Sequence, residues 1–172
     1  MEFQRNFLKL GKREEFFYGS ITLSEIEKKL KIIAKKQNFH IVFFQSNSEG
    51  KLIDCIQDAT NKYNGIIINA GGYSHTSVAL MDALKAYSKP IIEVHMSNIY
   101  AREEFRNYSY ISSVVDGSIC GLGYLSYEIA LEALNKLINI KLKNFKTAHG
   151  ANNIRGPNLS QAVPGVCAMH FL

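Results

Sequence analysis

The sequence predicts an α/β fold in which a parallel sheet is covered by helices on both faces. Segments with helical spacing of apolar residues alternate along the chain with short apolar runs, an order typical of such sheets. The run "GIIINAGG" at 65–72 begins with successive apolar residues instead of an alternation of apolar and polar ones. A strand of this kind needs cover on both sides. The 172 residues, 47% of them apolar, suit one domain with a sizeable core.

The first half of the chain reads as helix, strand, helix. Thr22 lies three residues before Glu25, which is a capping-box pattern, and apolar residues recur at helical spacing through residues 22–38. The β-rich run "HIVFFQS" follows at 40–46. Helical spacing returns at 49–63, so a second amphipathic helix is predicted there.

The alternation continues through the second half of the chain. The helix that begins at Ser74 is predicted to end before Pro90, because proline disfavours helical backbone in the residue that precedes it. The predicted elements are a strand at 65–72, a helix at 74–89, a strand at 90–97, a short helix at 102–107, a strand at 117–123 and a long helix at 125–144.

The charge of the chain does not identify a nucleic-acid partner. The formal net charge is +5 and the pI is near 9.1, which favours anionic partners in general. The basic residues are spread along helices such as residues 24–36, where a solvated face explains them. Aromatic residues do not interleave with them, and no known nucleic-acid motif is present, so no nucleic acid is expected as a partner.

Cysteine usage and hydropathy predict a cytoplasmic protein. Cys55, Cys120 and Cys167 are odd in number, widely spaced and form no C-x-x-C pair, which suits a reducing compartment. The first 17 residues carry charges within each apolar run, unlike a signal peptide. No run of about 18 apolar residues occurs, so no membrane segment is expected.

Polar side chains follow the predicted strands where a ligand site is expected. Open parallel sheets bind ligands at the carboxyl ends of their strands, beside the helix N-termini. Asn69 ends one apolar strand and His75 begins the next helix, while Glu93, His95 and Ser97 lie at the end of the following strand. Three segments therefore place polar groups at one edge of the sheet.

Glu93 and His95 form a candidate acid pair. Residues two apart on a strand project to the same face, so the carboxylate can orient the imidazole and hold a proton on it, as a general acid requires. A structural histidine is the alternative, and metal binding is a weaker one because no third ligand is well placed. The sequence of this edge leaves the choice open.

The glycines of "AGGYSHTS" at 70–77 do not form a nucleotide motif. The stretch lacks both G-x-G-x-x-G and G-x-x-x-x-G-K-[ST]. Gly71 and Gly72 can instead permit a tight turn, and the backbone N–H groups that follow can receive a carboxylate.

Three arginines and a tyrosine have two readings each. Arg13 lies five residues before Tyr18, either in a surface loop or where its charge lowers the pKa of the tyrosine so that the phenolate acts as a base. Arg102 and Arg106 lie one helical turn apart. Either can be a surface residue that pairs with Glu103 or a neighbouring acid, and Arg106 can instead bind substrate oxygens.

Five stretches together carry a more specific signal than any one motif: "LGKREEFFYGSITL", "FFQSNSEGKLID", "GIIINAGGYSHTSVALMDAL", "PIIEVHMSNIYAREEFRNYSYIS" and "GLGYLSYEIAL". In order and spacing they resemble the type II 3-dehydroquinate dehydratases, or type II dehydroquinases, over residues 6–143. The resemblance implies a flavodoxin-like doubly wound parallel sheet, no cofactor or metal, and a homo-oligomer, a dodecamer built from trimers. It implies the anti dehydration of 3-dehydroquinate to 3-dehydroshikimate through an enolate, in the shikimate pathway or in quinate catabolism.

The resemblance also implies a role for each matching residue. Tyr18 would remove the C2 proton, and Arg13 would keep that tyrosine ionised. His95, oriented by Glu93, would protonate the departing hydroxyl, and Asn6 would hold a water that stabilises the enolate. The positions that match substrate-binding residues are Asn69, His75, Asp82, Met96, Ser97 and Arg106, with Asp82 reaching the site of a neighbouring subunit.

The two ends of the chain depart from the family pattern. Residues 1–9 read "MEFQRNFLK" where the family has an apolar strand and G-P-N-L-N, so the first central strand is expected to be altered or missing. Residues 1–144 are predicted to form the domain, and residues 145–172 an atypical, loosely ordered tail. Its run "GVCAMHFL" can pack as a strand or pair with another chain, and its "GPNL" at 156–159 is either a permuted first strand or, as we favour, coincidence.

The altered N-terminus leaves two further functions open. One is a degenerate homologue that binds ligand or assembles without turnover. The other is an unrelated flavodoxin-like domain that binds a nucleotide or has a regulatory role.

Overall fold

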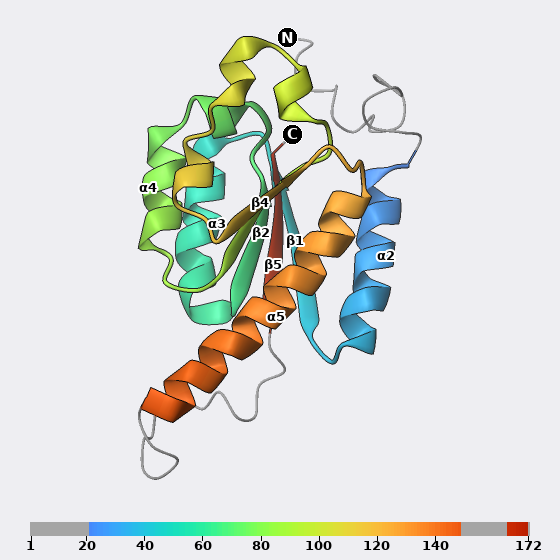
Figure 1. Cartoon of the computed structure of the whole chain (residues 1–172), viewed down its shortest axis with the longest axis vertical. Helices are drawn as coiled ribbons and strands as arrows, with labels where there is room; N and C mark the ends of the chain where they lie inside the picture. The colour runs from blue at the N-terminus through green and yellow to red at the C-terminus, as the bar shows by residue number, and fades with distance from the viewer. Residues whose placement is uncertain (1–20, 149–164, 172) are drawn as a thin grey trace.

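The computed structural model describes residues 21–148 and 165–171, which form a five-stranded parallel sheet with helices on both faces (Figure 1). The strands are β1 (His40–Ser46), β2 (Gly65–Asn69), β3 (Ile91–His95), β4 (Gly117–Cys120) and β5 (Gly165–Phe171). The helices are α2 (Leu23–Lys36), α3 (Glu49–Lys62), α4 (Val78–Ala86) and α5 (Leu125–Ala148). Short 3-10 turns are η2 (Gly71–His75), η3 (Ile99–Ala101), η4 (Glu104–Asn107) and η5 (Ile111–Ser113).

Each face of the sheet carries its own hydrophobic cluster. On one face α2 and α5 cover the sheet, and on the other α3 and α4 do (Figure 1). Neighbouring residues of one strand divide between the two clusters: Ile67 packs with α2 and α5, while Ile66 and Ile68 pack with α3 and α4. The prediction of a parallel sheet covered on both sides is confirmed, because the continuous apolar strands are buried from both directions.

Local signals placed most helix boundaries within a few residues. The capping box at the start of α2 is present, with the Thr22 side chain accepting from the Glu25 N–H and the Glu25 carboxylate accepting from the Thr22 N–H. The predicted helix at 74–89 instead divides into η2 and α4. The Ser77 hydroxyl caps α4 by accepting from the Leu80 N–H at 2.8 Å, so the α-helix begins after the serine.

The centre of the sheet is occupied by the C-terminal segment of the chain. The strand order is β1-β5-β2-β3-β4, and all four pairings are parallel. This is the flavodoxin-like order, with the last strand in the place that the first one usually takes. In Figure 1, β5 lies in dark red between β1 and β2, near the label of the C-terminus.

This arrangement corrects the prediction of a loose tail for residues 165–171, and it confirms the alternative in which this run packs as a strand. Residues 165–170 are buried, and β5 pairs with β1 along its whole length, from His40↔Gly165 to Ser46↔Phe171. An apolar strand between two others satisfies both ladders and buries both of its own faces, which a tail in solvent would not do. The helix α5 also continues past the predicted boundary at 144, to Ala148.

Three predicted catalytic residues, Asn6, Arg13 and Tyr18, lie outside the described residues. Among the helices that the structure describes, none has both the length and the apolar character needed to cross a membrane.

Candidate active site

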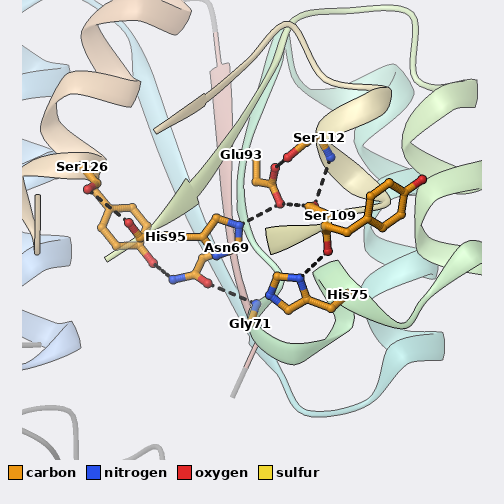
Figure 2. A network of polar contacts seen from close by, with 10 residues as sticks. Asn69, Gly71, His75, Glu93, His95, Ser109, Ser112 and Ser126 are labelled. Carbon is orange, nitrogen blue, oxygen red and sulfur yellow. Dashed lines mark hydrogen bonds and ion pairs between the residues drawn. The ribbon is translucent and has the colours of Figure 1, made fainter. Parts of the chain in front are cut away.

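The candidate site lies at the carboxyl ends of β2, β3 and β5. Because all strands are parallel, their last residues meet at one edge of the sheet: Asn69 of β2, His95 of β3 and, near the end of β5, His170. Figure 2 shows Asn69, His75, Glu93 and His95 gathered there. In a flavodoxin-like order the ligand crevice lies where the winding reverses, which here is beside β5.

Glu93 and His95 form a buried pair. Nε2 of His95 lies 2.9 Å from Oε1 of Glu93, and the two residues are 5% and 0% exposed. The hydroxyl of Ser109 also donates to Oε1, at 2.8 Å, and that of Ser112 donates to Oε2. The prediction that the two side chains share a face is therefore confirmed, and two serines from the segment after η4 complete the environment of the carboxylate.

The pKa of Glu93 is lowered. Burial alone would raise the pKa of this carboxyl group, but the hydrogen bond and charge of His95, with the bonds from Ser112 and Ser109, outweigh it. An ionised carboxylate only accepts hydrogen bonds, so Nε2 of His95 carries the proton between them. Nδ1 is then the nitrogen of His95 that is left to exchange a proton with a ligand.

His75 lies beside this pair in a defined tautomer. Its Nδ1 is 2.7 Å from the backbone oxygen of Tyr108, and since a carbonyl only accepts, Nδ1 carries the hydrogen. The rings of His75 and His95 are stacked, with centroids 6.0 Å apart. Burial lowers the pKa of His75, which favours the neutral ring and leaves Nε2 as an acceptor.

The amide of Asn69 is held on both sides. Its Oδ1 accepts from the Gly71 N–H at 3.2 Å, and its Nδ2 donates to Oη of Tyr127 at 2.8 Å. Gly71 has a φ of 52°, so the tight turn predicted after β2 depends on a backbone conformation that glycine adopts readily. Tyr127 Oη also lies 2.8 Å from Nδ1 of His170.

The remaining predicted binding residues lie around this centre without forming one cluster. Met96 and Ser97 directly follow β3 and are buried, and the Ser97 hydroxyl accepts from Arg102 at 3.5 Å. Arg106 donates from Nε to the Glu103 carboxylate at 2.7 Å, which is the surface pairing considered from the sequence. Asp82 is exposed on α4.

Four residues of the network were not found from the sequence. Ser109, Ser112 and Tyr127 reach the site through loop and helix packing, for which local spacing has no signal. His170 had one, because it is a polar residue directly after the apolar residues 166–169. Within residues 21–148 and 165–171 there is no group of three or more His, Cys, Asp or Glu side chains arranged to hold a metal ion.

Comparison with known proteins gives one family. The family model described as "Dehydroquinase class II" matches residues 5–135, a span that includes the positions of Asn6, Arg13 and Tyr18. A protein of Endomicrobium trichonymphae named 3-dehydroquinate dehydratase is 53% identical over 135 residues, covering 78% of this chain and 92% of that protein. One of the same name from Prochlorococcus marinus (strain NATL1A) is 51% identical over 125 residues, covering 73% and 86%.

Solved structures agree with this assignment. The crystal structure of the type II dehydroquinase from Butyrivibrio crossotus DSM 2876 superposes with a TM-score of 0.73 at 41% identity, covering 76% of this chain and 91% of that one. That from Propionibacterium acnes gives a TM-score of 0.72 at 37% identity, covering 76% and 90%. On the match of the family model and the identity to these relatives, the chain belongs to the type II dehydroquinase family.

Proposed function

We propose that this chain is a hydro-lyase that dehydrates 3-dehydroquinate to 3-dehydroshikimate, a step of the shikimate pathway. The observation that carries the proposal is the buried Glu93–His95 pair at the carboxyl edge of the sheet, in a chain about half identical to proteins named 3-dehydroquinate dehydratase. No cofactor or metal is needed for this reaction, since the ketone of the substrate makes the neighbouring proton acidic.

The elimination needs one base and one acid. A base takes the proton from C2, and the electron pair of the broken C–H bond forms an enolate with the adjacent ketone. The C1–O bond then breaks on the opposite face, and the departing hydroxyl takes a proton to leave as water. His95 suits the acid role, because Glu93 holds its Nε2 hydrogen and leaves Nδ1 to deliver a proton.

The base and the enolate stabiliser are assigned by resemblance. Tyr18 removes the C2 proton, Arg13 favours its phenolate, and Asn6 holds the water that stabilises the enolate. The family model spans all three positions.

The remaining polar groups bind the substrate. The fixed amide of Asn69 and the neutral ring of His75 contact its hydroxyls, and the backbone N–H groups of Met96 and Ser97 receive its carboxylate. Arg106 would leave Glu103 to bind substrate oxygens. Asp82, which is exposed on α4, reaches a neighbouring subunit in a trimer-based dodecamer.

The test is the enone absorbance of the product, recorded with purified protein and 3-dehydroquinate. Turnover is expected for the native sequence, with Tyr18→Phe abolishing it while ligand binding is retained, and with His95→Ala losing both rate and some affinity. A folded native protein that forms no enone contradicts the proposal. Binding of a substrate analogue without turnover would instead identify a degenerate homologue.

A further inference from the structure

We propose that His170, near the end of the C-terminal strand, is a positioning residue that fixes the amide of Asn69 through the hydroxyl of Tyr127. The inference rests on the proposed function only for its kinetic consequence. The direction of the hydrogen bonds among Asn69, Tyr127 and His170 is argued from their contacts and does not depend on the proposed function.

The contacts define the direction of both hydrogen bonds made by the Asn69 amide. The backbone N–H of Gly71 can only donate, so the oxygen of Asn69 faces it and the amide nitrogen faces Tyr127. That nitrogen donates to the Tyr127 oxygen. The tyrosine has one hydrogen of its own, and the other group within reach among the described residues is Nδ1 of His170, at 2.8 Å.

In the proposed order, Nδ1 of His170 accepts the hydrogen of Tyr127 and is the last acceptor in the series of hydrogen bonds that starts at Asn69. Tyr127 is buried, and burial raises the pKa of its phenol, so the hydroxyl keeps its hydrogen. If Tyr127 donates to Nδ1, the hydrogen of a neutral His170 ring lies on Nε2. Burial lowers the pKa of His170, which agrees with a neutral ring.

The contacts of His170 with the two neighbouring strands hold its ring in place. His170 is the register partner of Asn69 across the β5–β2 ladder and is 3% exposed. Its ring stacks on Phe43 of β1, with centroids 6.4 Å apart and planes 13° from parallel. The central strand β5 thus places His170 beside Asn69 of β2, and the ring packs on Phe43 of β1.

A purely structural role does not explain a histidine here. The preceding residues of β5 from Val166 to Met169 are apolar, and an apolar side chain would complete the buried strand. Instead Nε2 of His170 is buried with no hydrogen-bond partner among the described residues, which costs stability. The hydrogen bond that Nδ1 of His170 accepts from Tyr127 offsets this loss of stability.

Removing that acceptor should release Asn69. Without it, Tyr127 can satisfy its hydrogen by donating to the Asn69 oxygen, which requires the amide to flip. The flipped amide would place its NH2 group against the Gly71 N–H, two donors facing each other, so neither orientation is satisfied. The second amide hydrogen of Asn69 then no longer points in one direction toward the substrate.

The kinetic test compares His170→Phe with His170→Asn. Phenylalanine keeps the stack on Phe43 but removes the acceptor, and KM is expected to rise about tenfold with kcat changed less than about threefold. Asparagine restores an acceptor oxygen close to the place of Nδ1, so it should recover most of the native KM. Tyr127→Phe should match His170→Phe, and the double variant should add nothing further.

Met169→Leu is the matched control. Met169 is the preceding residue of the same buried strand, and its side chain packs in the cluster with α3 and α4. It should leave KM unchanged. A native KM in His170→Phe, or equal values for the Phe and Asn variants, would overturn the proposal.

A second measurement does not depend on turnover. Imidazole ¹⁵N NMR of the native protein should show His170 neutral with its hydrogen on Nε2, and Tyr127→Phe should change the shift of Nδ1. A hydrogen on Nδ1 in the native protein would refute the relay even if the kinetics agreed. If the native protein has no turnover, the proposed function fails while this result still decides the role of His170.

Discussion

At the scale of single residues, the Glu93 carboxylate is the group on which the acid role proposed for His95 depends. It is fully buried and accepts hydrogen bonds from one imidazole and two serine hydroxyls. A buried carboxylate with this many donors is ionised and oriented before a substrate arrives. The imidazole therefore needs no reorganisation to present Nδ1.

Glu93→Gln is predicted to reduce kcat by about 10²-fold or more, because a neutral amide cannot stabilise positive charge on the His95 ring. KM should change far less. The rate of enone formation at a series of 3-dehydroquinate concentrations gives both kcat and KM. The control is Glu132→Gln, which removes an exposed carboxylate paired with Lys136 on α5 and should leave both constants unchanged. Equal loss of activity in the two variants would contradict the assignment.

The burial of His170 leads us to predict how the free energy of unfolding depends on pH. Burial lowers the pKa of His170 from 6.5 to about 4. Between these values the unfolded chain takes up a proton that the folded chain does not, so the free energy of unfolding falls as pH falls, by on the order of 3 kcal/mol. His75 adds a contribution of the same sign. Glu93, whose pKa is lowered, loses its contribution in more acidic solution as it becomes protonated.

Urea unfolding at a series of pH values checks this. His170→Asn should flatten the slope between about pH 6.5 and 4, because the titrating group is gone. Met169→Leu, which removes no titrating group from the same strand, should not. An unchanged slope in His170→Asn would show that His170 is protonated in the folded state or not buried.

At the scale of elements, β5 holds the sheet together. It pairs with β1 and β2 and sends alternate side chains into both hydrophobic clusters, Val166 and Ala168 into one and Cys167 and Met169 into the other. Without it, β1 and β2 would each face an open ladder inside the molecule.

Met169→Ala is predicted to lower the free energy of unfolding by about 2–5 kcal/mol, because a fully buried side chain would leave a cavity. Ile140→Ala on α5 is the control, since Ile140 is 52% exposed and should cost less than about 1 kcal/mol. Denaturant unfolding of both variants gives the comparison. A loss of stability at Met169 no larger than at Ile140 would mean that β5 is not the central strand in solution.

Element prediction succeeded where the signal was local. The Thr22–Glu25 box and the apolar strand before Asn69 are contained in their own sequences. The helix predicted at 74–89 was divided by the Ser77 cap, a serine that periodicity alone did not distinguish from a helical position. β5 was underestimated because its seven residues carry no indication of which ladder they will join.

At the scale of the whole molecule, three exposed aromatic side chains are where we expect contact with other copies of the chain, if the assembly implied by the resemblance forms. Tyr100, Phe105 and Tyr108 are each more than 60% exposed and lie in the segment between β3 and β4, and the Phe105 ring lies with its centroid 6.3 Å from that of His75. Aromatic residues are enriched at protein interfaces.

Sedimentation velocity is predicted to show a homo-oligomer built from trimers, as the resemblance implies. Changing the three aromatic residues together to serine should reduce the mass while the unfolding temperature of the subunit stays within a few degrees of its native value, because exposed side chains contribute little to the fold. A native protein that sediments as a monomer across the micromolar range would contradict the expected assembly.

The sequence by itself determined α2, α3 and α5, the buried strands β2 and β3, and the common face of Glu93 and His95, because these depend on residues close together in the chain. Only the tertiary structure decided that the C-terminal strand fills the centre of the sheet, that Ser109 and Ser112 close on Glu93, and that Tyr127 joins Asn69 to His170. The physical reason is that these contacts join segments far apart in sequence. Which partner each segment meets depends on which ladders and faces the rest of the chain leaves open.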